Sequence, residues 1–273
     1  LTVLFGANSA GKSSLGRLLL ALQQTARSTD RKRALHLGDT SSLIDLGTFT
    51  DCLHGHDLTQ SLSFELGWTL PKTMDVRDPL QTEARYQGNH MRLDVALAAN
   101  KAQQPEVQTL RYGLFTGEKE VLDVVLERDE KRKLHLTSEL YGFKMADGRK
   151  WPLEEPEKFY RLSDTSMARY KNAGFLADFA LATESMLERI SYLGPLRSHP
   201  QRIYQWSGDT PASVGQMGEY TIAAILAAQG EGRRLNRQVG HLTKGFAEFI
   251  AAWLKDLGVI HDFAVRPVAA GRK

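Results

Sequence analysis

The sequence predicts an α/β protein in which a glycine-rich loop joins the first strand to the first helix. Residues Leu1–Phe5 form a short apolar run that is typical of a strand, and a glycine-rich turn follows at once. From about Ser61 to Leu140, apolar and polar residues alternate with a period of two, as in half-buried strands. Helical spacing marks the segment after the loop, at Leu15, Leu18, Leu19 and Leu22.

The composition is that of an ordinary globular protein. The 273 residues are 42% apolar and 25% charged, which is enough to form a sizeable core, and the net charge of +3 does not demand an acidic partner. The single cysteine, Cys52, excludes an internal disulfide, so we expect a cytoplasmic location. The sequence shows no membrane-spanning run and no signal peptide, so we expect no membrane association.

We expect three parts within a single unit. Residues 1–60 hold the first strand, the loop, the first helix and a following loop, in which Thr25–Asp39 is a polar, basic helix end plus loop. Residues 61–140 form an antiparallel β-meander. Residues 141–273 form a helical part with a returning strand at 190–193. Within it we expect helices near Met217–Gln229 and Asn236–Leu257, and a strand at Val259–Val268.

The strands of the meander are separated by turn signals. These are Gln87–Asn89, Thr116–Glu118 and the charged segment Arg128–Lys133, whose spacing fits antiparallel hairpins. Beyond the meander, helical spacing predicts core positions at Phe175, Phe179, Ala182, Met186 and Ile190.

The chemistry is concentrated in the glycine-rich loop. Residues Gly6–Ser13 match G-x-x-x-x-G-K-[ST], the phosphate-binding P-loop, and lie between the predicted strand and helix as that motif requires. A triphosphate needs several backbone N–H donors on one concave surface, and a tightly curled loop supplies them. The predicted nucleotide-binding residues are Gly6, Ala7, Asn8, Ser9, Ala10, Gly11, Lys12, Ser13 and Ser14.

Three of these residues have specific predicted roles. Lys12, the candidate catalytic residue, would place its charge between the β- and γ-phosphates, and the Ser13 hydroxyl would ligate Mg²⁺. Ser14 would lie near the α-phosphate at the helix N-terminus. The expected cofactors are therefore ATP and Mg²⁺.

Other polar segments carry weaker signals. Hydrolysis also needs a carboxylate on a second strand, but the nearest candidate, Val124–Glu127, is better explained as an amphipathic hairpin strand. Ser213–Gln216 is similar to an ABC signature, yet its position favours a turn at a helix N-terminus. Asp51–Asp57, with Cys52, His54 and His56, matches no standard zinc spacing, so we expect a polar loop.

Three segments of the chain resemble the ABC-type ATPases related to SMC/Rad50-like and OLD-like enzymes, which include ATPase subunits of bacterial anti-phage systems such as Septu. The segments are Leu1–Leu15, Leu46–Asp57 with its Leu-Gly-Thr-Phe-Thr-Asp run, and Tyr192–Tyr220. The last contains Tyr-Leu-Gly-Pro-Leu-Arg and the glycine-rich block ending in Gly218, Glu219 and Tyr220.

The resemblance implies the N-terminal part of an ATPase head, incomplete at both ends, with the Walker B, signature and switch residues outside it. It also implies ATP hydrolysis and a homodimer of heads that controls a nuclease or other effector, with nucleic acid as a possible target, in anti-phage defence or DNA repair. Arg197 and Arg202 would lie near the nucleotide face or a dimer interface, or simply brace their loop.

Two other functions remain open from the sequence. In the first, ATP holds an assembly together with negligible turnover. In the second, the chain is a P-loop kinase that phosphorylates a small molecule, although the long β-meander differs from the strand–helix alternation usual in such kinases.

Overall fold

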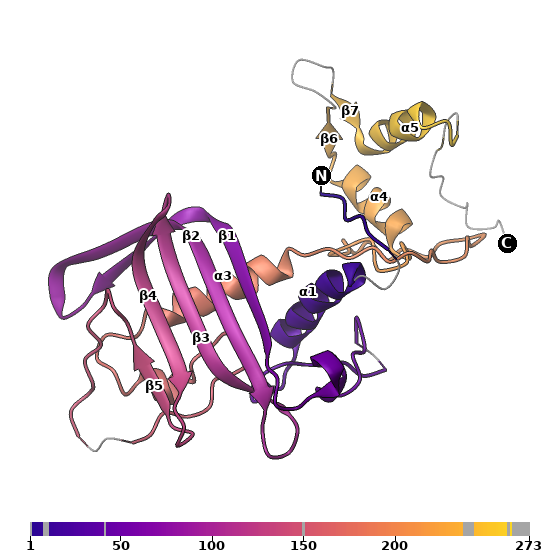
Figure 1. Cartoon of the computed structure of the whole chain (residues 1–273). Helices are drawn as coiled ribbons and strands as arrows, with labels where there is room; N and C mark the ends of the chain where they lie inside the picture. The colour runs from indigo at the N-terminus through magenta and orange to yellow at the C-terminus, as the bar shows by residue number, and fades with distance from the viewer. Residues whose placement is uncertain are drawn as a thin grey trace. The chain divides into compact units, whose positions relative to one another are not determined.

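The computed structural model describes residues 2–7, 11–40, 42–148, 151–236, 243–260 and 263. The chain divides into two compact units, Leu1–Ile190 and Ser191–Lys273 (Figure 1).

The first unit is built on a five-stranded antiparallel sheet, in which each strand pairs with its neighbour in sequence. This confirms the predicted meander (Figure 1). The strands are β1 (Leu62–Asp78), β2 (Gln81–Ala99), β3 (Pro105–Thr116), β4 (Lys119–Arg128) and β5 (Leu134–Thr137).

Apolar and polar residues alternate along the strands, so the sheet has one apolar face and one polar face. The predicted apolar positions of β2 are at most 3% exposed, at Met91, Leu93, Val95 and Leu97. The residues between them, Arg92 and Asp94, point to the opposite face because successive side chains of a strand alternate.

Two of the three predicted turns are confirmed, and one is wrong. Turns join β3 to β4 and β4 to β5 as expected. The Gln87–Asn89 signal lies inside β2, where Gly88 pairs with Met74 of β1. A Cβ on Gly88 would lie 2.6 Å from both Leu114 Cγ and Phe115 O. This glycine therefore permits close approach of β3 and does not form a turn.

The helices of the first unit are α1 (Lys12–Arg27) and α3 (Leu176–Glu188), with shorter turns η1 (Thr50–Cys52), η2 (His54–His56) and α2 (Asp164–Met167). In Figure 1, α3 passes behind the strands of the sheet. Its buried Phe179 ring lies 5.3 Å from the rings of both Tyr112 and Phe175. The predicted helix is confirmed, although Ile190 lies beyond its end.

Two predicted strands are not formed. Residues 2–5 adopt no strand, and Val3, Leu4 and Phe5 are 56%, 52% and 90% exposed. The returning strand at 190–193 is also absent. A strand needs a neighbour to pair its N–H and C=O groups, and neither segment pairs with a strand among the described residues. The five-stranded sheet and the helices confirm the prediction of a mixed α and β class. The predicted P-loop core sheet, in contrast, is not formed within the described ranges.

The second unit contains α4 (Thr221–Gly230), β6 (Arg234–Leu235), β7 (Lys244–Gly245) and α5 (Phe246–Asp256). Both helices start later than predicted. Gly218 precedes α4 with a φ of 76°, which a right-handed helix cannot contain. The strand β7, which pairs with β6, lies inside the range expected for the second helix, and α5 begins directly after it. Most of the predicted strand 259–268 lies outside the described residues.

Across the described ranges, no helix has the length and apolar character to cross a membrane.

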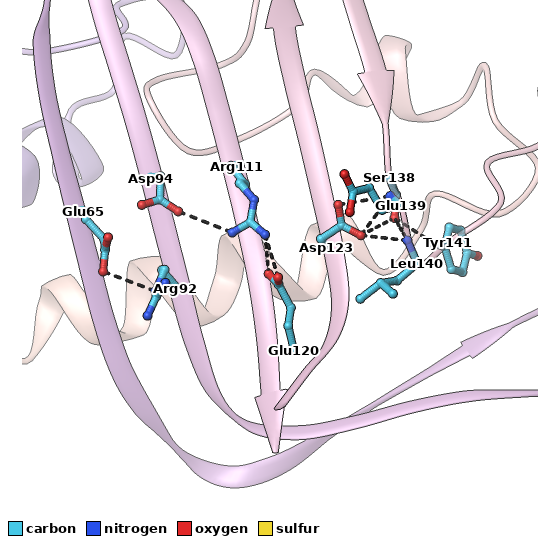
Figure 2. A network of polar contacts seen from close by, with 10 residues as sticks. All are labelled: Glu65, Arg92, Asp94, Arg111, Glu120, Asp123, Ser138, Glu139, Leu140 and Tyr141. Atoms are coloured by element: carbon cyan, nitrogen blue, oxygen red, sulfur yellow. Dashed lines mark hydrogen bonds and ion pairs between the residues drawn. The ribbon is translucent and has the colours of Figure 1, made fainter. Parts of the chain in front are cut away.

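The outer face of the sheet carries a ladder of ion pairs (Figure 2). Glu65 Oε1 lies 3.2 Å from Arg92 Nε on the adjacent strand. Arg111 lies between Asp94, with an N–O distance of 3.7 Å, and Glu120, with a distance of 2.6 Å. Such partly exposed pairs contribute about 0–1 kcal/mol each, so the core face supplies most of the stability of the sheet.

Asp123 holds the chain that leaves β5 (Figure 2). Its carboxylate accepts hydrogen bonds from Ser138 Oγ at 2.8 Å and from the N–H groups of Glu139 at 3.0 Å and Leu140 at 2.9 Å. Burial by itself would raise the pKa of Asp123, but these hydrogen bonds and the nearby charge of Arg111 together outweigh it and hold the pKa below the ordinary 3.8.

We expect Asp123→Asn to lower the free energy of unfolding at pH 7 by about 1–2 kcal/mol, because the hydrogen bonds lose their charged acceptor. A lowered carboxyl pKa stabilises the fold fully above pH 3.8, and this contribution is lost as the pH falls through the folded-state value. Urea unfolding between pH 7 and pH 2.5 should therefore show the two proteins converging in acid. Glu127→Gln, on an exposed residue of the same strand, is the control. A difference that does not depend on pH would contradict this role.

Candidate nucleotide-binding loop

The candidate loop ends where α1 begins. Gly11, the N-cap of α1, has φ 80° and ψ 6°, a left-handed conformation that residues with a Cβ rarely adopt. The N–H of Ser14 donates to the carbonyl of Gly11 at 3.0 Å, which closes the first turn. The helix therefore starts at Lys12, as the motif predicts.

Lys12 draws the two ends of the loop together. Its ammonium donates to the carbonyl oxygens of Gly6 at 2.8 Å and Ala7 at 2.6 Å. The predicted site residues Asn8, Ser9 and Ala10 lie outside the described residues.

The first turn of α1 is electrostatically suited to an anion. It contains no Asp or Glu, and the N-terminal end of a helix carries partial positive charge. Ser13 and Ser14 are exposed there, so both hydroxyls are accessible. The described part of the predicted site is thus brought together at one helix end, with the Lys12 charge beside it.

The other half of α1 is firmly anchored. Gln23 is 2% exposed, and its Nε2 donates to the carbonyls of Leu187 at 2.8 Å and Ile190 at 2.7 Å, at the end of α3. Thr25 Oγ1 donates to Ala21 O and accepts from the N–H of His36. The loop is therefore carried by a helix that is fixed to the core of the first unit.

This anchor was missed by the sequence analysis. The segment from Thr25 to Asp39 was expected to be an exposed helix end plus loop, but Thr25 and Leu35 are at most 1% exposed. Lys158, far away in the chain, donates from Nζ to the carbonyl of Ala26 at 2.6 Å and so caps α1. The Gln23-Gln24-Thr25 run on a helix was the available signal, but its partners lie at distant positions.

The segment Leu46–Asp57 folds as a compact loop. Asp51 Oδ2 accepts hydrogen bonds from the N–H of Thr48 at 2.8 Å and from its hydroxyl at 2.7 Å, and these bonds lower the pKa of Asp51. Phe49, between them, is 1% exposed in the core. The Gly-Thr-Phe-Thr-Asp run thus has a structural role. In the described part of the chain, no group of three or more His, Cys, Asp or Glu side chains is placed to hold a metal ion.

In the second unit, the two blocks of the third resembling segment lie together. Gly194 N–H donates to Gln216 O at 2.7 Å, and Ser198 N–H donates to Met217 O at 2.9 Å. Arg197 Nη1 donates to the carbonyl of Gly194, so this arginine braces its own loop.

Glu219 organises the turn before α4. Backbone N–H groups, including those of Glu219 itself, Met217 and Gln216, lower the pKa of its carboxyl. Gly215 has a φ of 83°, and a Cβ there would lie 2.3 Å from the Glu219 carboxyl carbon. Ser213–Gln216 is therefore part of a glycine-dependent turn that ends before α4 begins at Thr221, and it does not start the helix itself.

The carboxylate candidate Val124–Glu127 lies in β4, which pairs with β3 and β5. Val124 and Leu126 are buried while Glu127 is exposed, which confirms an amphipathic hairpin strand.

Comparisons of the chain with protein-family models, with curated proteins and with solved structures found no match. The function therefore has to be argued from the geometry of the loop and its helix.

Proposed function

We propose that the chain binds ATP with Mg²⁺ at the loop Gly6–Ser14. The observation that carries the proposal is the Lys12 ammonium, which lies against the carbonyls of Gly6 and Ala7 at the start of α1. A phosphate-binding loop directs backbone N–H groups toward its ligand, and the helix end adds positive partial charge, so a polyphosphate would be favoured there.

The residues present suit both parts of the ligand. An ammonium has three N–H donors and acts as a point charge, which fits Lys12 to the β- and γ-phosphates. Ser13, exposed in the first turn, would supply a hydroxyl oxygen to Mg²⁺, and oxygen ligands are the ones this ion prefers. The bound ion would neutralise phosphate charge, while Ser14 and the first N–H groups of α1 would hold the α-phosphate side.

The resemblance extends the proposal to ATP hydrolysis, with two heads that dimerise around the nucleotide and thereby control an effector or nuclease. In such an arrangement ATP stabilises the dimer and hydrolysis releases it. Steady-state phosphate release from the assembled ATPase, compared with its Lys12→Ala variant, tests this extension. Equal rates would favour a scaffold that binds ATP without turnover.

The nucleotide site itself is tested by calorimetric titration with Mg·ATP. We expect Lys12→Ala to weaken binding by about 1.5–3 kcal/mol, which is the scale of a hydrogen bond to a charged group. Lys101→Ala, at an exposed lysine in the turn between β2 and β3, should bind as the unchanged protein does. Ser13→Ala should weaken binding with Mg²⁺ more than binding of ATP in EDTA. Unchanged affinity in Lys12→Ala would reject the site.

A further inference from the structure

A second candidate site lies in the first unit, in a groove between β1 and α3. The groove has a volume of about 790 Å³.

 One wall is the continuous run from Trp68 to Asp75, and the other is a face of α3. Its apolar lining includes Trp68, Leu70, Met74, Leu181, Met186 and Ile190.

The groove exists because β1 leaves its ladder at this point. The pairing of β1 with β2 is interrupted between Thr69 and Met74, so the residues between them are free to form a wall. The lining positions of α3 run from Asp178 to Arg189 with spacings of mainly three and four, which is one helix face. Eleven residues of helix rise about 16 Å, so the groove is elongated.

The middle of this face is apolar and uncovered. Leu181 is 61% exposed, although the opposite face of the same helix places Phe179 in the core. Met74 and Met186 add flexible side chains that adapt to the shape of a ligand. The volume lies within the range of about 300–1,000 Å³ that is usual for small-molecule sites.

Charge distinguishes the two ends of the groove. Asp178 lies in the first turn of α3 and Arg189 lies just after its last turn, so their charges are at opposite ends of the helix face. The carboxylate of Asp75 is already neutralised by Arg85, at 2.7 Å, and by Arg77, at 3.2 Å. At the Arg189 end, the Gln23 amide donates to the carbonyl of Leu187, in the last turn of α3, and to that of Ile190, just beyond the helix, which reduces their repulsion of an anion.

We propose that this groove binds an elongated amphipathic anion, with its alkyl chain along Leu181 and Met186 and its carboxylate at Arg189. The site is independent of the nucleotide loop, since all the residues that line it lie outside Gly6–Ser14.

Calorimetric titration of the full chain with decanoate, below its micelle-forming concentration, tests the proposal. We expect saturable binding of one decanoate per chain. Leu181→Ala should weaken binding about fivefold, because it removes part of the apolar contact. Leu196→Ala, at a leucine that is 72% exposed in the second unit, is the matched control and should not change the affinity.

The charged end is tested with Arg189→Gln and with a cationic probe. Arg189→Gln should weaken decanoate binding about fivefold or more, and decyltrimethylammonium should bind the unchanged protein more weakly than decanoate does. Ala182→Phe should block the groove, and circular dichroism verifies that this variant folds. If it does not fold, the comparison of Leu181→Ala with Leu196→Ala still tests the proposal. Equal binding of the two probes, equal effects of the two leucine variants, or no saturable binding would overturn the proposal.

Discussion

Phe179→Ala is expected to lower the free energy of unfolding of the first unit by about 3–5 kcal/mol. The side chain is fully buried, and its ring contacts those of Tyr112 and Phe175 between α3 and the sheet. Truncation removes apolar contacts and leaves a cavity, which rigid strands on one side cannot fill by relaxing. Tyr112 is itself fixed by a hydrogen bond from its hydroxyl to Tyr160 O, so it cannot move in.

Urea unfolding followed by circular dichroism measures this effect. Leu181→Ala, two residues away on the same helix, is the control because its side chain is 61% exposed, and its expected change is within about 0.5 kcal/mol. Similar losses in the two variants would show that the ring cluster does not hold α3 against the sheet. The same control variant reports on the groove, where it should reduce decanoate binding without reducing stability.

Arg128→Met is expected to lower the free energy of unfolding by about 3 kcal/mol. Its side chain is only 4% exposed and pairs with Glu106, itself 13% exposed, at 3.2 Å. Removing one partner of a buried ion pair typically costs about 3–5 kcal/mol, since the other charge stays buried without compensation. Arg132 also contacts Glu106 and would keep it partly paired, so we expect the lower end of that range.

Arg132→Met is the matched control on the same turn. Its side chain is 47% exposed, and exposed pairs contribute about 0–1 kcal/mol. Denaturant titration of both variants at low and high salt distinguishes the buried ion pair of Arg128 from the exposed ion pair of Arg132, because salt screens the exposed pair more strongly. An Arg128 loss no larger than the Arg132 loss would contradict the buried role.

Local patterns predicted much of the fold. The meander could be expected because each strand pairs with the next along the chain, so alternation such as Met91, Leu93 and Val95 identifies both strand and face. The start of α1 could be expected because Gly11 and Lys12 are adjacent in the motif. These features depend on residues that are close in sequence.

Features that depend on distant partners could not be predicted. The run Gln87–Asn89 has the composition of a turn. Its Gly88 nevertheless lies inside β2, where Leu114 and Phe115 of β3 approach it closely. Arg128 occurs in a charged run that indicates solvent exposure, yet Glu106 and Glu155 cover its guanidinium. Residues 2–5 have the pattern of a strand but pair with no strand among the described residues.

The sequence by itself determined the meander, the apolar face of its strands and the position of the candidate phosphate loop, because periodicity and adjacent residues carry that information. Only the tertiary structure decided how Gln23 anchors α1 to the end of α3 and which side chains line the groove beside β1. The reason is physical: burial and hydrogen bonding depend on which distant segments meet, and neither is encoded in the local pattern of either segment alone.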